Sequence, residues 1–98
     1  MRYLLFLLFI LPILGFAQNN VTVSGTISDL NSGERLVGAT IYSPEAKLGV
    51  SANAYGFFSI KLPKGLTTIQ ASYVGYQTSS ARINLQKDTV LNFNIKTS

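Results

Sequence analysis

The clearest strand pattern in the chain is FFSIKLPKGLTTIQASYV, residues 57–74. Its first half alternates apolar and polar residues with a period of two, which is typical of a strand with one buried face. Pro63-Lys64-Gly65 predicts a turn, and the second half is rich in the β-branched and aromatic residues that strands favour. The predicted inward residues are Phe58, Ile60 and Leu62 on the first strand, and Ile69, Ala71 and Tyr73 on the second.

The same alternation continues on both sides of this stretch, and no helical periodicity is visible after residue 20. Turn signals recur at about 10-residue spacing, which is typical of a small antiparallel sandwich. Two sheets can then bury their apolar faces against each other. We therefore predict an all-β domain with seven strands, over residues 21–27, 39–42, 48–51, 57–62, 67–74, 81–85 and 91–95.

Composition excludes most catalytic chemistry. The chain has 98 residues with no His and no Cys, so it has no imidazole base, no thiolate and no ordinary transition-metal site. Asp29 and Glu34 share one loop and could form a carboxylate pair or cation site, although a solvated loop is the favoured interpretation. We predict no enzyme activity, no cofactor and no bound metal.

The charge pattern argues against a nucleic-acid partner. The chain has 8 Lys or Arg residues against 4 Asp or Glu residues, a formal net charge of +4. The basic residues are dispersed singly after residue 20, whereas nucleic-acid-binding domains cluster them on one face. Solvated surface charge is therefore the favoured interpretation.

The first 17 residues predict a secretory signal peptide. A positive Met1-Arg2 precedes an uncharged run over residues 3–17, and small residues Gly15 and Ala17 precede Gln18. The alternative is a retained membrane anchor, but this run of 15 residues contains a proline and a membrane helix needs about 20 apolar residues. We predict an exported protein whose signal segment is only transiently in the membrane.

The predicted organisation is then a signal peptide (1–17), a short linker (18–20), a β-sandwich domain (21–95) and a tail (96–98). Within the domain, Tyr55 and Phe57 point away from the core by the alternation, so they are candidates for an exposed contact with a glycan or peptide. Core and turn packing is the general alternative for the aromatic residues. The predicted turn and motif residues are Gly25, Gly38, Asn53, Gly56, Gly75 and Tyr76.

Three stretches, in this order and spacing, resemble the carboxypeptidase D regulatory-like domain. They are VSGTI (23–27), GERLVGATI (33–41) and SYVGYQT (72–78). A fourth family stretch, T-D-x-x-G-x-F, is matched in part, because Asn53 stands where Asp is usual. Asn still suits the turn, but its lack of charge weakens any cation role.

The resemblance implies a transthyretin-like (prealbumin-like) Greek-key sandwich of seven antiparallel strands. It also implies a setting, since such domains follow the signal peptide of SusC-type TonB-dependent outer-membrane receptors of Bacteroidetes, which import nutrients. The related hydrolases of this fold use His residues, which are missing here. The implied function is a non-catalytic docking or positioning module on the periplasmic face of the outer membrane.

The implied partners are envelope proteins, or the receptor's own plug and barrel. No TonB box, plug or barrel follows residue 95 in this sequence, so we expect either a fragment of a receptor or a stand-alone exported domain. The alternative function is a stand-alone carbohydrate- or peptide-binding domain. An exposed edge strand could also add to a partner's sheet or support weak self-association.

Overall fold

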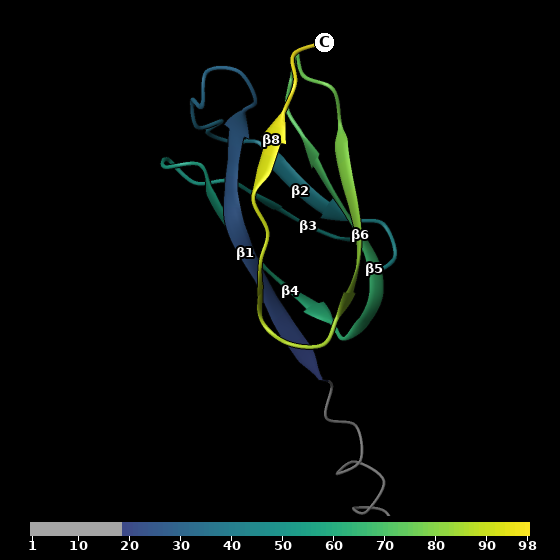
Figure 1. The fold of residues 1–98 in the computed structure, drawn as a ribbon. Coiled ribbons are helices and arrows are strands. Elements are labelled where there is room, and N and C mark those ends of the chain that lie inside the picture. The colour runs from purple at the N-terminus through teal and green to yellow at the C-terminus, as the bar shows by residue number, and fades with distance from the viewer. Residues whose placement is uncertain (1–18) are drawn as a thin grey trace, which may run out of the picture.

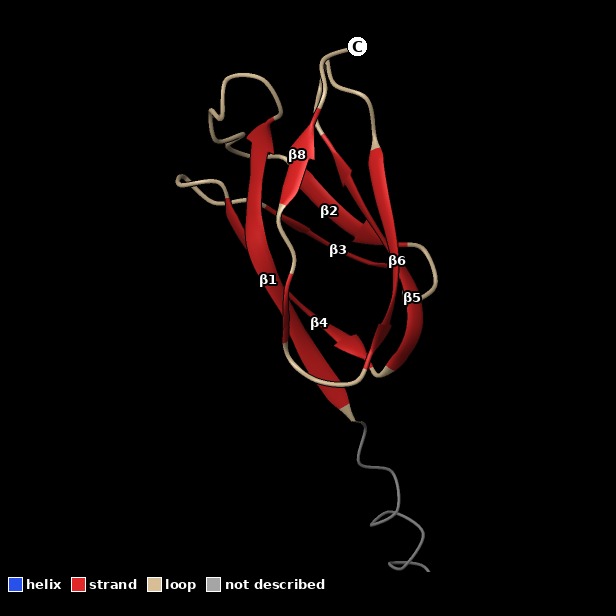
Figure 2. Ribbon diagram, in the orientation of Figure 1, coloured by secondary structure: helices blue, strands red, loops and turns tan. Residues whose placement is uncertain are grey.

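The structure is a computed structural model that describes residues 19–98. The predicted signal peptide (1–17) and Gln18 lie outside the described residues. Residues 19–98 contain strands and loops without a helix (Figure 2), and hence no helix long and apolar enough to cross a membrane. The strands are β1 (Asn20–Asp29), β2 (Thr40–Ser43), β3 (Leu48–Ser51), β4 (Phe57–Pro63), β5 (Gly65–Ser72), β6 (Ser79–Leu85), β7 (Thr89–Val90) and β8 (Phe93–Ile95).

These strands form two sheets, as the sequence predicts. One sheet has the order β4-β1-β7, with β8 also paired to β1, and the other has the order β3-β2-β5-β6. Figure 1 shows β1 running along the domain from the end where the chain enters to the end where the C-terminus lies. The start of β1 and the C-terminus therefore lie at opposite ends of the domain.

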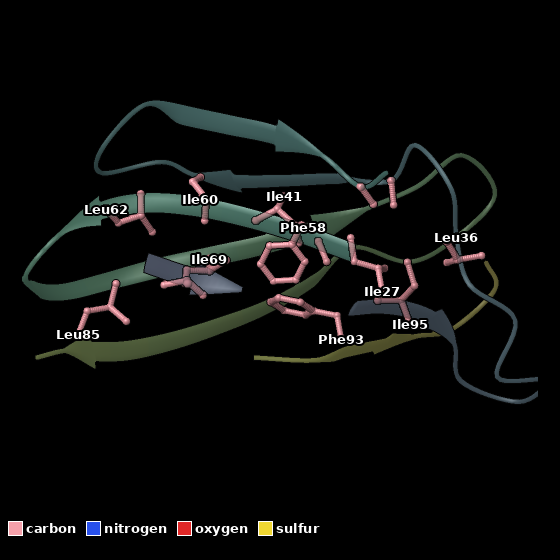
Figure 3. Close-up of a cluster of buried hydrophobic side chains, with 14 of the residues drawn as sticks. Ile27, Leu36, Ile41, Phe58, Ile60, Leu62, Ile69, Leu85, Phe93 and Ile95 are labelled. Carbon is pink, nitrogen blue, oxygen red and sulfur yellow. The ribbon is translucent and has the colours of Figure 1, made fainter. Parts of the chain in front are cut away.

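The core lies between the sheets, where the alternation places it. Val21, Val23 and Ile27 of β1 are buried, and the first two pair with Leu62 and Ile60 of β4. Figure 3 shows side chains from both sheets meeting, with the Phe58 and Phe93 rings side by side. Burial of each large apolar side chain stabilises the fold by about 1.5–3 kcal/mol.

The prediction of seven antiparallel strands is wrong at the C-terminal end. Only residues 93–95 of the predicted strand 91–95 form a strand, β8, and the short strand β7 (Thr89–Val90) precedes it; both run parallel to β1. At the break, the Leu91 carbonyl lies against Gly25, where any Cβ atom would overlap it. The Asn92 side chain fills the gap, since its Oδ1 accepts the Thr26 N–H at 3.0 Å.

The inward placement of Tyr73 is also wrong. The predicted strand 67–74 begins earlier, at Gly65, and ends at Ser72. Tyr73 then opens a turn in which its carbonyl accepts the Tyr76 N–H at 3.0 Å. Because the strand has ended, the alternation no longer sets the side-chain direction, and Tyr73 is 37% exposed.

Candidate functional site

The two residues predicted to be exposed contacts lie at one end of β4. Tyr55 is 73% exposed and Phe57 is 51% exposed. The guanidinium carbon of Arg35 lies 5.6 Å from the centre of the Phe57 ring, within range of a cation–π interaction. We call Arg35, Tyr55 and Phe57 the aromatic tip. Whether the tip binds a ligand stays a prediction.

The aromatic tip is positioned by the turn that the sequence predicts at residues 53–56. Oδ1 of Asn53 accepts the Tyr55 N–H at 2.9 Å and the Phe57 N–H at 3.1 Å. Gly56 has a φ of 77°, which favours glycine, and a Cβ there would lie 2.8 Å from Cβ of Arg35. The turn therefore brings the arginine stem close to the β4 start.

Asp29 and Tyr76 form a contact at the C-terminal end of the domain. The Tyr76 hydroxyl donates to Oδ2 of Asp29 at 2.6 Å, while Oδ1 accepts the N–H groups of Asn31 and Ser32. The Tyr76 hydroxyl, followed by the N–H groups of Ser32 and Asn31, holds the pKa of Asp29 below its usual value. The hydrogen bond to Asp29, together with desolvation, raises the pKa of Tyr76 to about 12.

This contact was not predicted, since Asp29 and Tyr76 are 47 positions apart and no local pattern links them. It also argues against the less favoured alternative, a carboxylate pair of Asp29 and Glu34, because both Asp29 oxygens are engaged and Glu34 meets Asp29 through its backbone carbonyl. Within residues 19–98, no group of three or more His, Cys, Asp or Glu side chains could hold a metal ion.

Glu45 is a second carboxylate that accepts a hydrogen bond from a backbone N–H group. It follows the end of β2, and its Oε1 accepts the Thr68 N–H of β5 at 2.9 Å. Its Oε2 accepts the Thr68 hydroxyl at 3.0 Å and Nη1 of Arg82 at 3.3 Å. The Thr68 N–H is the main cause that lowers the pKa of Glu45 to about 2.

An open hollow of about 370 Å³ lies where the turn before β2 and the start of β2 meet the end of β5 and the turn that follows it. Tyr73 and Val74 form its apolar side, and Val74 is 94% exposed. The Tyr73 ring lies 5.7 Å from the Tyr76 ring, so the hollow adjoins the Asp29–Tyr76 contact. The lining residues are Gly38, Thr40, Ser72, Tyr73 and Val74.

The predicted motif glycines fall into two groups. Gly38 and Gly75 lie in turns with φ values of 80° and 86°, which other residues adopt rarely. Gly25 lies within β1 and allows the close approach of Leu91. None of these glycines lies at the start of a helix in residues 19–98, which is where a phosphate-binding loop places them.

Comparison with solved structures finds similar folds. A putative membrane-associated protein of unknown function from Bacteroides fragilis is 20% identical, with a TM-score of 0.57 over 83% of this chain and 29% of that one. A DUF3823 family protein from Parabacteroides merdae is 17% identical, with a TM-score of 0.57 over 84% and 47%. The C-terminal domain of the shaft pilin SpaA from Lactobacillus rhamnosus GG is 10% identical, with the same score over 83% and 100%.

These likenesses concern the fold alone, and this chain spans less than half of the Bacteroides and Parabacteroides chains. No curated protein matches the sequence. The family model for the CarboxypepD_reg-like domain matches residues 23–98, which include all three stretches that carry the resemblance. The chain therefore belongs to the CarboxypepD_reg-like domain family.

Proposed function

We propose that this protein is a non-catalytic, transthyretin-like module on the periplasmic face of the outer membrane. It acts by docking as part of, or beside, a TonB-dependent SusC-type receptor for nutrient uptake in a Bacteroidetes-type bacterium. The observation that carries the proposal is a family domain that directly follows a predicted signal peptide. The similar Bacteroides fragilis protein, itself described as membrane-associated, has the matching region as 29% of its length.

The use of the carboxylates supports a non-catalytic role. Asp29, Glu45 and Asp88 each accept backbone N–H groups. The pKa values of Asp29 and Glu45 are both lowered, so these two carboxylates are poor general acids at neutral pH. The chain has no His or Cys to supply another base or nucleophile.

The size and fraction of the native product test the proposal. An antibody raised against residues 18–98 would be used on cytoplasmic, periplasmic and outer-membrane fractions. We expect an outer-membrane band much larger than the 81 residues left after cleavage (98 − 17), or a smaller product that co-purifies with a receptor. A product found in the cytoplasm would contradict export and the proposal with it.

The alternative function, glycan or peptide binding by a stand-alone domain, is favoured by one observation. The aromatic tip presents two exposed rings beside a cation, and such surfaces suit sugar faces and peptide carboxylates. Amide chemical shifts would be followed during titration with a panel of glycans. Binding that is lost in Tyr55→Ala but kept in Tyr42→Ala, a control on the other sheet, would support this function.

A further inference from the structure

The outer strand β6 has one free edge. It pairs with β5 on one side, and it is the last strand in the order β3-β2-β5-β6 (Figure 1). A free edge presents unpaired N–H and C=O groups that can pair with another extended chain. The C-terminal tail pairs only with the segment before β6, where Thr97 bridges Tyr76 and Gln77 donates to the Lys96 carbonyl at 2.7 Å.

The register identifies the free groups. Thr68 directs its N–H away from β6, because that N–H donates to Glu45 beside β2. Thr68 pairs with Arg82, so in an antiparallel ladder Arg82 also directs its backbone groups away from β5. Alternate residues of β6 share this direction, and the free N–H and C=O groups belong to Ser80, Arg82 and Asn84.

The other long outer strand is protected. β4 also has seven residues, but it carries Lys61 and ends at Pro63, and both residue types discourage strand addition. β6 has no proline and no lysine, and its one charged residue is Arg82. Its inward residues Ala81 and Ile83 are only partly buried against the core, so a further strand would cover them.

The positive charge of Arg82 indicates which kind of strand could pair with β6. In the antiparallel register that pairs all the free groups of two copies, Arg82 would lie directly opposite Arg82, and like charges in that position are destabilising. An acidic residue opposite Arg82 would be favourable. The described contacts of Arg82 use only Nη1, with Glu45 and Thr68, and a guanidinium has five donors.

We propose that β6 is a strand-addition site for an extended segment of a partner protein, with an acidic residue opposite Arg82 and apolar residues on both sides of it. The apolar residues would cover Ala81 and Ile83, while backbone bonds to Ser80, Arg82 and Asn84 would supply affinity. The proposal rests on the docking function and identifies the edge and the chemistry of the partner.

A peptide titration tests this site. The probe is the capped nine-residue peptide Ser-Val-Thr-Val-Glu-Val-Thr-Val-Ser, and its matched control has Lys in place of Glu. The exported and processed chain, labelled with ¹⁵N, would be followed by amide chemical shifts. We expect shifts at Ser80, Arg82 and Asn84 but not at Lys61, and about 3–10-fold weaker binding of the Lys peptide, because a repulsive pair replaces an attractive one.

Arg82→Glu is the decisive variant, because Arg82 is exposed and the substitution leaves the core intact. It should reverse the preference between the two peptides. Shifts at β4 or at the aromatic tip in place of β6, an unchanged preference in Arg82→Glu, or β6 shifts that depend on protein concentration without peptide would each overturn the proposal. These outcomes leave the docking function standing, since membrane fractionation tests that function separately.

Discussion

The interior strands β1 and β5 and the outer edge of β6 differ in how their backbone groups are paired. Around β1, side chains fill gaps in the ladder: Asp88 accepts the Thr22 N–H at 2.9 Å and Asn92 accepts the Thr26 N–H at 3.0 Å. Beside β5, Glu45 does the same for Thr68. Along the outer edge of β6, no strand or side chain in residues 19–98 pairs with the alternating backbone groups.

This difference indicates which backbone groups stabilise the domain and which can bind another chain. Buried or half-buried backbone groups without partners cost free energy, so the chain uses polar side chains where a strand is missing. At β6 water can reach the backbone, and the edge remains available to another chain. We therefore assign a stabilising role to the strands around β1 and a docking role to the outer edge of β6.

Gly25→Val should break the β1 side with the largest effect. Its side chain would overlap the Leu91 carbonyl, and β7 and β8 would have to move away from β1. We expect a loss of about 3 kcal/mol or more, comparable to the whole stability of a domain of this size. Urea unfolding followed by circular dichroism measures it. Ser24→Ala, next to it on the same strand, is the control and should remain folded.

Ile27→Ala and Ile83→Ala compare the two sides directly. Ile27 on β1 is fully buried, whereas Ile83 on β6 is only partly buried. We expect losses of about 2–5 kcal/mol for Ile27→Ala and about 1 kcal/mol for Ile83→Ala, because the cost follows the apolar volume removed from the core. If urea unfolding gave equal losses of unfolding free energy for the two variants, Ile83 on β6 would be as well buried as Ile27 on β1.

Glu45→Gln should remove part of the acid sensitivity of the fold. The pKa of Glu45 is lowered to about 2 in the folded chain from a usual 4.5, so its stabilisation is present above about pH 4.5 and is lost as the pH falls toward 2. Melting temperature would be measured from pH 7 to pH 2. The variant should start lower at pH 7 and fall less; a fall as steep as that of the wild type would contradict this role.

Tyr76→Phe should act at the other end of the pH range. The pKa of Tyr76 is raised to about 12 from 10.0, so its stabilisation is present below pH 10 and is lost between pH 10 and 12. The variant should be less stable than the wild type at pH 7, with a gap that narrows as the pH rises toward 12. A gap that stays constant would show that the hydrogen bond to Asp29 contributes nothing.

Tyr55→Ala should have the smallest effect on stability. Tyr55 is the more exposed aromatic residue of the tip, and such surface substitutions change stability by about 0.5 kcal/mol or less. Urea unfolding would measure the change. A loss several times larger would mean that Tyr55 holds the fold together and is not available for a contact.

The sequence predicted most of the fold because alternation is a local signal. It identified the inward faces of β1, β4 and β6, and the two-sheet architecture. It failed where a distant residue changes the local pattern. Gly25 and Asn92 shape the break between β7 and β8, so the last predicted strand is shortened to β8, and the early end of β5 turns Tyr73 outward.

The candidate sites were predicted less completely. Exposure of Tyr55 and Phe57 followed from the turn at Asn53 and the alternation. The Asp29–Tyr76 contact and the open edge of β6 could not be predicted, because both depend on which strands become neighbours. Leu36, a loop residue that is buried in the core, was missed for the same reason: it belongs to no period-2 pattern.

Native-state hydrogen exchange of the protein alone would show whether the outer edge of β6 is open. We expect an alternating pattern along β6, with fast exchange at Ser80, Arg82 and Asn84 and slow exchange at Ala81 and Ile83. The amides paired with side chains, Thr22, Thr26 and Thr68, should also exchange slowly. Uniform protection of the amides along β6 would instead mean that this edge is already covered and is not available to a partner.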